Sequence, residues 1–235
     1  MTDTAPIEFG SFEALTFDCY GTLIDWERGI VETLAPVLGR DGGAVDRERV
    51  LEVYARNEAA LEAGEYLPYG EIVTRAMTAV CAEFGVEADD DERARFGRSV
   101  GEWPPFEDSP EALRRLSSKF RLGVITNCDD DLFALSAQRL GIAFDWVVSA
   151  QQAGAYKPSE RPFRLALERL DVPAARILHV AQSLYHDHVV ANRLGLSSVW
   201  IDRRRGMPGS GATPPAEAAP DATYPDMRSF ADAAV

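Results

Sequence analysis

Short apolar segments that alternate with helical segments constrain the fold of this chain most strongly. After residue 106 the sequence repeats one pattern, in which a brief apolar run bounded by turn-forming residues precedes a longer run with apolar residues at helical spacing. The strands predicted in this way are residues 122–126, 146–149, 177–181 and 198–201, and the helices are 111–116, 129–140, 159–170 (with Ser159 as its N-cap) and 187–194. This alternation predicts a parallel sheet covered by helices on both faces.

The first strand is separated from the others by a long helical stretch. Residues 15–18 (LTFD) form a short apolar run closed by a glycine turn, whereas residues 27–106 show only helical periodicity. The expected fold class is therefore α/β: a doubly wound parallel core made of residues 1–26 and 107–235, with an inserted helical cap domain at 27–106. Residues 206–222, rich in glycine, proline and alanine, are expected to form an exposed loop.

Charge and cysteine content exclude several classes of partner. Acidic residues outnumber basic ones 38 to 24, and the net charge of −14 repels nucleic acid and anionic membranes. The sequence contains neither a long apolar run nor a basic-then-apolar leader, so we expect a cytoplasmic protein. Its 3 cysteines have no disulfide or zinc spacing.

Polar residues follow each predicted strand. In a parallel sheet the carboxyl ends of the strands meet at one edge, where ligands bind. The residues expected at this edge, in chain order, are Asp18, Thr22, Thr126, Asn127, Lys157, Gln182, Ser183 and Asp187. Lys157 is one of two lysines in a chain that otherwise uses arginine, so its position indicates a role for a compact point charge. Together these residues predict a single site, in which Lys157 keeps the carboxylate of Asp18 ionised.

Four segments resemble the four motifs of the haloacid dehalogenase superfamily. They are FDCYGTLID around Asp18, VITN ending at Asn127, YKPSERPF with Lys157, and HVAQSLYHD ending at Asp187. The first motif most resembles the 2-haloacid dehalogenase group. The resemblance implies a hydrolase in which Asp18 is a nucleophile that forms an ester, water hydrolyses that ester, and Lys157, Asp187 and Thr22 assist as catalytic residues. It also allows a homodimer formed through the cap.

Two positions bear on the choice between a phosphatase and a dehalogenase. Magnesium-dependent phosphatases of the superfamily carry an acidic residue where this chain has Tyr20, and an acidic metal ligand where it has Gln182. Tyrosine is a poor acid at neutral pH, and magnesium prefers anionic oxygen ligands. We therefore expect no cofactor; if magnesium binds, Asp18 and Asp187 are its ligands. The insert contains no lysine, which excludes the phosphonate-cleaving relatives.

A halide leaving group needs no proton, so the expected substrate is a small 2-halocarboxylate. Arg56 is expected to bind its carboxylate or the halide, beside Tyr20, Thr126, Asn127, Gln182 and Ser183. The aromatic residues Tyr20, Trp26, Tyr66, Tyr69 and Trp103 are candidates for the pocket wall.

The fourth motif departs from the dehalogenase group. Leu184 stands where that group has an asparagine that helps to hold the hydrolytic water. His186 is a candidate replacement base, although a surface position at a helix start is the expected one. A hydrolase of a C–N bond in another small carboxylate, a magnesium phosphatase and a non-catalytic binding module therefore remain as alternatives.

Overall fold

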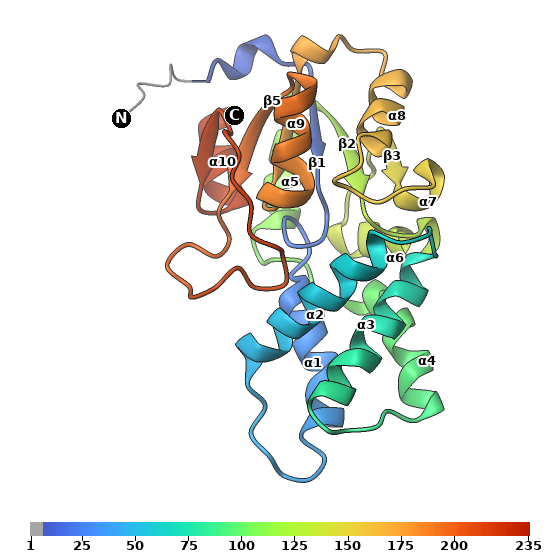
Figure 1. Ribbon diagram of the computed structural model, residues 1–235. Helices are drawn as coiled ribbons and strands as arrows, with labels where there is room; N and C mark the ends of the chain where they lie inside the picture. Colours follow the sequence, from blue (N-terminus) through green and yellow to red (C-terminus); the bar gives the residue numbers. More distant parts are fainter. Residues whose placement is uncertain (1–6) are drawn as a thin grey trace.

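The computed structural model describes residues 7–235, and its centre is one parallel sheet of six strands. The strand order is β3-β2-β1-β4-β5-β6, which confirms the predicted doubly wound topology (Figure 1). The strands are β1 (Ala14–Phe17), β2 (Arg121–Thr126), β3 (Trp146–Ser149), β4 (Ile177–Ala181), β5 (Ser197–Ile201) and β6 (Ala222–Tyr224). Since β1, β2 and β4 are neighbours, their carboxyl ends bring three of the predicted motifs together.

Helices cover both faces of this sheet and one of its ends. They are α1 (Trp26–Leu38), α2 (Arg47–Glu62), α3 (Tyr69–Glu83), α4 (Asp90–Ser99), α5 (Ser109–Leu116), α6 (Asp130–Leu140), α7 (Ala150–Ala153), α8 (Arg161–Arg169), α9 (Val189–Leu194) and α10 (Met227–Ala234). Within residues 7–235, no helix combines the length and the apolar character that crossing a membrane requires.

Residues of the central strands enter two hydrophobic cores, one on each face of the sheet. Leu15 and Phe17 of β1 point into the larger core, which also contains side chains of α5, α6 and α10. Ala14 of β1 and Ile125 of β2 belong to the second core, which Phe163 of α8 fills from the opposite face. Because both faces of the central strands are buried, these strands are mostly apolar, which is why they appear as short apolar runs in the sequence.

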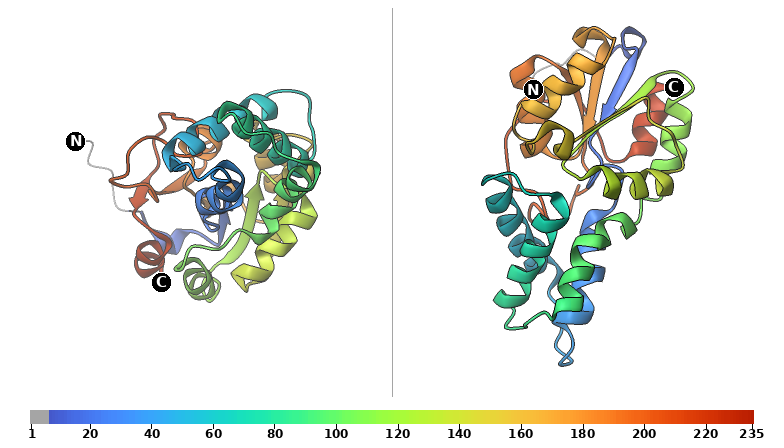
Figure 2. Two further views of the ribbon diagram at one scale, coloured as in Figure 1. Left: turned by 90° about the horizontal axis from the view of Figure 1, so that it is seen from below. Right: turned by 90° about the vertical axis from the view of Figure 1, so that its right-hand side faces the viewer.

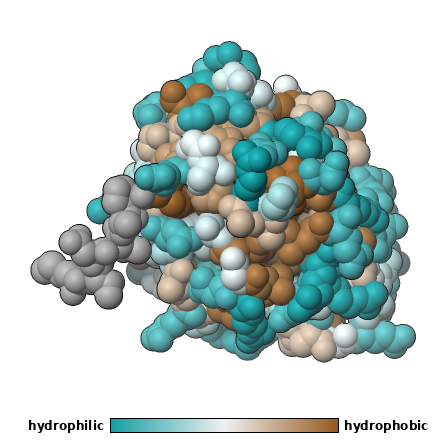
Figure 3. All heavy atoms as spheres, turned by 90° about the horizontal axis from the view of Figure 1, so that it is seen from above, coloured by the Kyte–Doolittle hydropathy of each residue, from teal (hydrophilic) through white to brown (hydrophobic). Residues whose placement is uncertain are grey.

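The helices α1 to α4, which we call the helical insert, lie beyond the carboxyl ends of the strands (Figures 1 and 2). Their start points are set by aspartates: Asp25 caps α1, Asp46 caps α2, and Asp89 forms a capping box with Glu92 on α4. Buried side chains of the insert continue the larger core of the sheet. The opposite end of the molecule presents apolar side chains among polar ones (Figure 3).

Two predicted helix starts are wrong. Ser159 is not the N-cap of α8, because the helix begins at Arg161 and Glu160 occupies the N-cap position. Asp187 does not begin a regular α-helix, because residues Leu184–His188 form a π-helical turn before α9. The wider turn presents His186 and Asp187 in different directions, and such turns often occur at functional sites.

The C-terminal region is more structured than its composition indicates. The predictions omit the short strand β6 and the helix α10 that packs on α5. The loop expected to be exposed at 206–222 is buried at 211–213, where it runs between the sheet and the helical insert. Arg204, just before this segment, forms ion pairs with Glu27 of α1 and Glu48 of α2, so the loop joins the two parts of the molecule.

Gly21 makes the turn after β1 possible. Its φ of +92° is rarely adopted by other residues, and a Cβ here would lie 2.9 Å from Trp26 Nε1 and 3.1 Å from Gln182 Oε1. The turn therefore requires glycine both for its backbone conformation and for the space around it.

We expect Gly21→Ala to lower the free energy of unfolding by about 3 kcal/mol, as measured by urea titration. The alanine would have to adopt a positive φ, and its Cβ would clash with Trp26. Gly141→Ala is the matched control, since Gly141 has φ +69° but no heavy atom within 4 Å of the added Cβ. Its expected loss is about 1 kcal/mol. Equal losses in the two variants would contradict the steric part of this explanation.

Candidate active site

The ammonium group of Lys157 lies at the carboxyl edge of the sheet and joins three elements. Its Nζ donates to Asp18 Oδ1 at 2.9 Å, to Asp187 Oδ1 at 2.7 Å and to the backbone oxygen of Ile125 at 2.9 Å. An ammonium has three N–H donors, so these contacts use all of them. The sequence-predicted convergence of Asp18, Lys157 and Asp187 is therefore observed in the geometry.

The hydroxyl of Thr22 holds the second oxygen of Asp18. The backbone N–H of Gln182 donates to Thr22 Oγ1 at 2.8 Å, and Thr22 Oγ1 donates to Asp18 Oδ2 at 2.6 Å. Since the hydroxyl oxygen is occupied as an acceptor, its proton points toward Asp18. Both oxygens of Asp18 thus accept hydrogen bonds, as expected of a carboxylate rather than a carboxylic acid.

Burial and charge act against each other in this cluster. Burial raises the pKa of Asp18, with Lys157 and Thr22 opposing it and Asp187 adding to it. Burial lowers the pKa of Lys157, but the carboxylates of Asp18 and Asp187 outweigh it and raise the pKa above its usual range. Burial likewise raises the pKa of Asp187, but Lys157 and His179 outweigh it and hold the pKa well below its usual range.

Asp187 lies behind the ammonium rather than at an open surface. Its side chain is fully buried, and its Oδ1 also contacts His179 Nε2 at 3.0 Å. The other ring nitrogen of His179 contacts Thr16 Oγ1 at 3.0 Å, so both ring nitrogens of this buried histidine have partners. Asp187 therefore contacts and orients Lys157 from within the core.

A small cavity lies in front of Asp18, between the sheet edge and the helical insert. Its walls are formed by Asp18, Tyr20, Trp26, Glu58, Glu62, Tyr69, Asn127, Lys157, Ser183, His186 and Thr213. Its volume of about 20 Å³ is enough for roughly one water molecule. A substrate larger than water therefore requires the wall side chains or the insert to move.

Two glutamates of α2, which the sequence analysis did not identify, face this cavity. Glu58 Oε1 accepts hydrogen bonds from Tyr54 Oη at 2.8 Å and Tyr69 Oη at 2.9 Å. The side chain of Glu62 is 7% exposed, and Asn127 Nδ2 donates to it at 3.3 Å. Burial raises the pKa of Glu58 to about 7, and burial together with Glu58 raises that of Glu62 well above its usual range. No spacing signal marks these residues, because glutamates on a helix ordinarily face solvent.

The expected surface position of His186 is wrong. Its imidazole lies in the cavity wall, because the backbone N–H of His186 donates to Ser183 Oγ at 2.8 Å and the π-helical turn directs the ring inward. Within the described chain its Nε2 has no hydrogen-bond partner, and Glu62 Oε2 is 3.7 Å away. Burial lowers the pKa of His186 to about 4, so the ring is neutral at pH 7.

The predicted cavity position of Arg56 is also wrong. Its side chain is 56% exposed and forms an ion pair with Glu83 of α3. Among residues 7–235, the wall of the cavity contains Lys157 as its only lysine or arginine.

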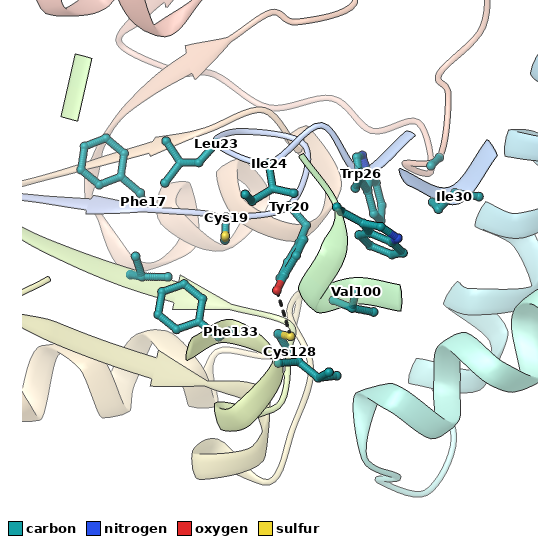
Figure 4. Close-up of a cluster of buried hydrophobic side chains, with 14 of the residues drawn as sticks. Phe17, Cys19, Tyr20, Leu23, Ile24, Trp26, Ile30, Val100, Cys128 and Phe133 are labelled. Carbon is teal, nitrogen blue, oxygen red and sulfur yellow. Dashed lines mark hydrogen bonds between the residues drawn. The ribbon is translucent and has the colours of Figure 1, made fainter. Parts of the chain in front are cut away.

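The hydroxyl group of Tyr20 forms hydrogen bonds outside the cavity. Its Oη contacts Ser136 Oγ at 2.9 Å and accepts from Cys128 Sγ at 3.3 Å, as the dashed line in Figure 4 shows for the sulfur contact. Burial raises the pKa of Tyr20 well above its usual range. Tyr20 therefore contributes its ring to the cavity and offers no proton there. Trp26 and Tyr69 are also wall residues, whereas Tyr66 and Trp103 are not.

The remaining predicted residues hold the site in place. Asn127 fixes the backbone on both sides of Lys157: its Oδ1 accepts from Lys157 N at 2.7 Å, and its Nδ2 donates to Lys157 O at 3.0 Å. Thr126 is buried behind the wall. The side chain of Gln182 accepts from Thr213 at 3.3 Å, and neither Thr126 nor Gln182 lines the cavity.

The side chains here do not fit a magnesium ion. Gln182 is neutral, and Asp18 and Asp187 already share the Lys157 ammonium at 2.9 and 2.7 Å, where a cation between them would be repelled. Across residues 7–235, histidine, cysteine, aspartate and glutamate nowhere form a group of three or more that could hold a metal ion.

The fold and site are those of an α/β enzyme with a charged carboxylate at the edge of its sheet. The family model for haloacid dehalogenase-like hydrolases matches residues 12–184. The chain belongs to this family of hydrolases.

Named relatives include enzymes of two kinds. The (S)-2-haloacid dehalogenase of Pseudomonas putida is 27% identical over 203 residues, which cover 83% of this chain and 87% of that protein. The phosphatase YigB of Escherichia coli (strain K12), which acts on 5-amino-6-(5-phospho-D-ribitylamino)uracil, is 28% identical over 210 residues, or 84% and 86% of the two chains.

The fold is also similar to that of a solved dehalogenase. The structure of L-2-haloacid dehalogenase from Xanthobacter autotrophicus with chloropropionic acid covalently bound matches with a TM-score of 0.77 at 20% identity. The match covers 94% of this chain and 97% of that one, and it supports the fold alone.

The buried carboxyl of Glu58 predicts a pH-dependent stability. In the unfolded chain this group loses its proton near pH 4.5, and in the folded chain near pH 7. Below pH 4.5 both states are protonated; above pH 7 the folded state carries the full cost of ionisation. Relative to Glu58→Gln, we expect the wild type to lose about 2–3 kcal/mol of unfolding free energy between pH 5 and pH 8, measured by urea titration.

Glu52→Gln on the same helix is the control, because Glu52 is 60% exposed and its pH profile should follow the wild type. If the profiles of Glu58→Gln and the wild type run parallel, the carboxyl of Glu58 does not ionise with a raised pKa.

Proposed function

We propose that this hydrolase removes halide from small 2-halocarboxylates through an ester on Asp18, without a metal ion. The observation that carries this proposal is the state of Asp18: a carboxylate at the cavity wall with both oxygens held, one by Lys157 and one by Thr22. Such a group is charged, oriented and shielded from bulk water, as a nucleophile must be. The name of the dehalogenase relative from Pseudomonas putida supports the same reaction.

The proposed reaction has two steps. In the first, an oxygen of Asp18 forms a bond to C2 of the substrate, and the C–halogen bond breaks with its electron pair leaving as halide. In the second, water adds to the carboxyl carbon of the Asp18 ester, the bond to the substrate oxygen breaks, and a 2-hydroxy acid leaves. The carboxylate is restored and one proton passes to solvent.

The nature of the leaving group follows from Tyr20. The alcohol of a phosphate ester, or an amine, is a good leaving group only when an acid protonates it. Tyr20 stands at the position of that acid in the phosphatases, and its phenol contacts Ser136 and Cys128 instead. Halide leaves without a proton, so this site favours it.

The substrate carboxylate meets neutral donors rather than an arginine. All three donors of Lys157 are used, and Arg56 lies outside the cavity. Among the wall residues, Ser183 Oγ accepts from His186 N, and its own proton is free for the substrate. The Asn127 amide donates to Lys157 O and to Glu62, and the Thr213 hydroxyl donates to Gln182. We propose that the Ser183 hydroxyl binds the carboxylate, which implies weak ground-state binding.

One observation favours a second candidate, the hydrolysis of a C–N bond in another small carboxylate. With a pKa of about 7, Glu58 keeps its proton in a large fraction of molecules at neutral pH. A protonated carboxyl in the cavity wall can protonate an amine leaving group, which Tyr20 cannot do.

A reducing compartment such as the cytoplasm is proposed on separate grounds. Cys19, Cys81 and Cys128 are all free thiols in the structure.

We expect the purified enzyme, in the presence of EDTA, to release halide from chloroacetate or 2-bromopropanoate, and Asp18→Asn to lose at least about 1000-fold of this activity because its nucleophile is gone. Ion chromatography of the released halide measures both. Asp171→Asn, at an exposed aspartate, is the control and should keep full activity.

If the enzyme releases no halide from any of a panel of halo acids, 2-halocarboxylates are excluded as its substrates. Formation of amine from a small amino acid under the same conditions would then favour the C–N reaction. Turnover of p-nitrophenyl phosphate that depends on added magnesium would favour a phosphatase instead.

A further inference from the structure

We propose that His186 is the base that activates the hydrolytic water, and that Glu62 positions this water from the opposite wall of the cavity. This inference rests on the proposed ester at Asp18, because it concerns only the second step, in which that ester is hydrolysed. It assigns a function to two side chains that the first step does not use.

The imidazole of His186 is held rigidly. Its backbone N–H is bonded to Ser183 Oγ at 2.8 Å, and its ring packs edge-on against Tyr185 with 4.9 Å between the ring centroids. The residue is 8% exposed and lies in the same wall as Asp18. Its Nε2, without a hydrogen-bond partner anywhere in residues 7–235, is a buried polar atom that lacks a ligand.

Glu62 supplies the second contact for that ligand. Its Oε2 lies 3.7 Å from His186 Nε2, which is too far for a direct hydrogen bond but leaves both atoms within reach of one water placed beside them. Asn127 Nδ2 donates to the same carboxyl group at 3.3 and 3.4 Å and fixes its orientation. The free volume of about 20 Å³ is the volume of a single water.

The other candidate base lies away from the cavity. Asp187 Oδ2 has no hydrogen-bond partner among residues 7–235, but Asp187 is fully buried and does not form part of the cavity wall, and its Oδ1 is shared by Lys157 and His179. Leu184 replaces the water-holding asparagine that the resemblance implies at its position, and it cannot accept or donate. His186 is the wall residue with a neutral imidazole and an unused nitrogen.

The proton transfers balance in this scheme. His186 Nε2 takes a proton from water as the water oxygen bonds to the carboxyl carbon of the Asp18 ester. The tetrahedral intermediate then collapses, the bond to the substrate oxygen breaks, and the imidazolium returns its proton to that oxygen, which leaves as the hydroxyl of the 2-hydroxy acid. The remaining proton of the new Asp18 carboxylic acid is released to solvent.

The test separates the two steps by rapid quench with 2-bromopropanoate. In His186→Asn and Glu62→Gln we expect a burst of about one bromide per enzyme at the wild-type rate, followed by steady turnover reduced about 100-fold. Intact-mass spectrometry should show the Asp18 ester accumulated in both variants and little of it in the wild type. For His186→Ala, added imidazole should restore part of the steady rate.

His188→Gln is the matched control, because His188 lies on the same turn but contacts Ser198 and the backbone of Ala181 instead of the cavity. Its destabilisation should cause no accumulation of ester. If the variants of His186 and Glu62 form the ester and hydrolyse it at the wild-type rate, the proposal is overturned. If no protein, wild type included, releases bromide, the proposed function itself fails.

Discussion

The ammonium of Lys157 is the interaction on which the site depends. It is buried with two carboxylates, Asp18 and Asp187, and removing any one of the three would leave charge in the core without its partner, at a cost of about 3–5 kcal/mol. Neighbouring residues hold Lys157 Nζ in this position. The carbonyl of Ile125 takes the third donor at the end of β2, and Asn127 binds the backbone of Lys157 on both sides. The sheet edge thus fixes the charge of the nucleophile before any ligand arrives.

The two walls of the cavity differ in their chemistry. The sheet side contributes the ion pair of Lys157 and Asp18, whose donors and acceptors are already hydrogen-bonded. The insert contributes Glu58 and Glu62, whose pKa values are raised by burial. Bringing Glu58 and Glu62 against the sheet edge therefore opposes closure as the pH rises, unless a donor binds between the walls. A water bound to Glu62 and His186, or a donor on the substrate, satisfies that requirement.

The sequence predicted the site residues correctly where ionisable residues follow predicted strands. Asp18 and Asp187 follow neighbouring strands, so the parallel topology brings them together, whereas Lys157 follows α7 and reaches them because Asn127 holds its backbone. It was uninformative about which side of α2 faces the sheet. Arg56 and Glu58 are two positions apart, so they lie about 200° apart around the helix, and choosing the wrong face exchanges an arginine for a glutamate. His186 was misplaced because a π-helical turn cannot be predicted from a short segment. Thr213 was misplaced because its loop is rich in glycine, proline and alanine, which indicates exposure, but tertiary contacts bury it.

The size of the cavity has a consequence for the timing of catalysis. A space that holds one water cannot exchange reactant for product while it stays shut. Moving the insert away from the sheet edge would stretch the ion pairs that join Arg204 to Glu27 and Glu48. The side chains of Arg204 and Glu27 are only 10% and 13% exposed, so salt screens this pair little. Opening and closing of the cavity can thus limit turnover as much as bond making does.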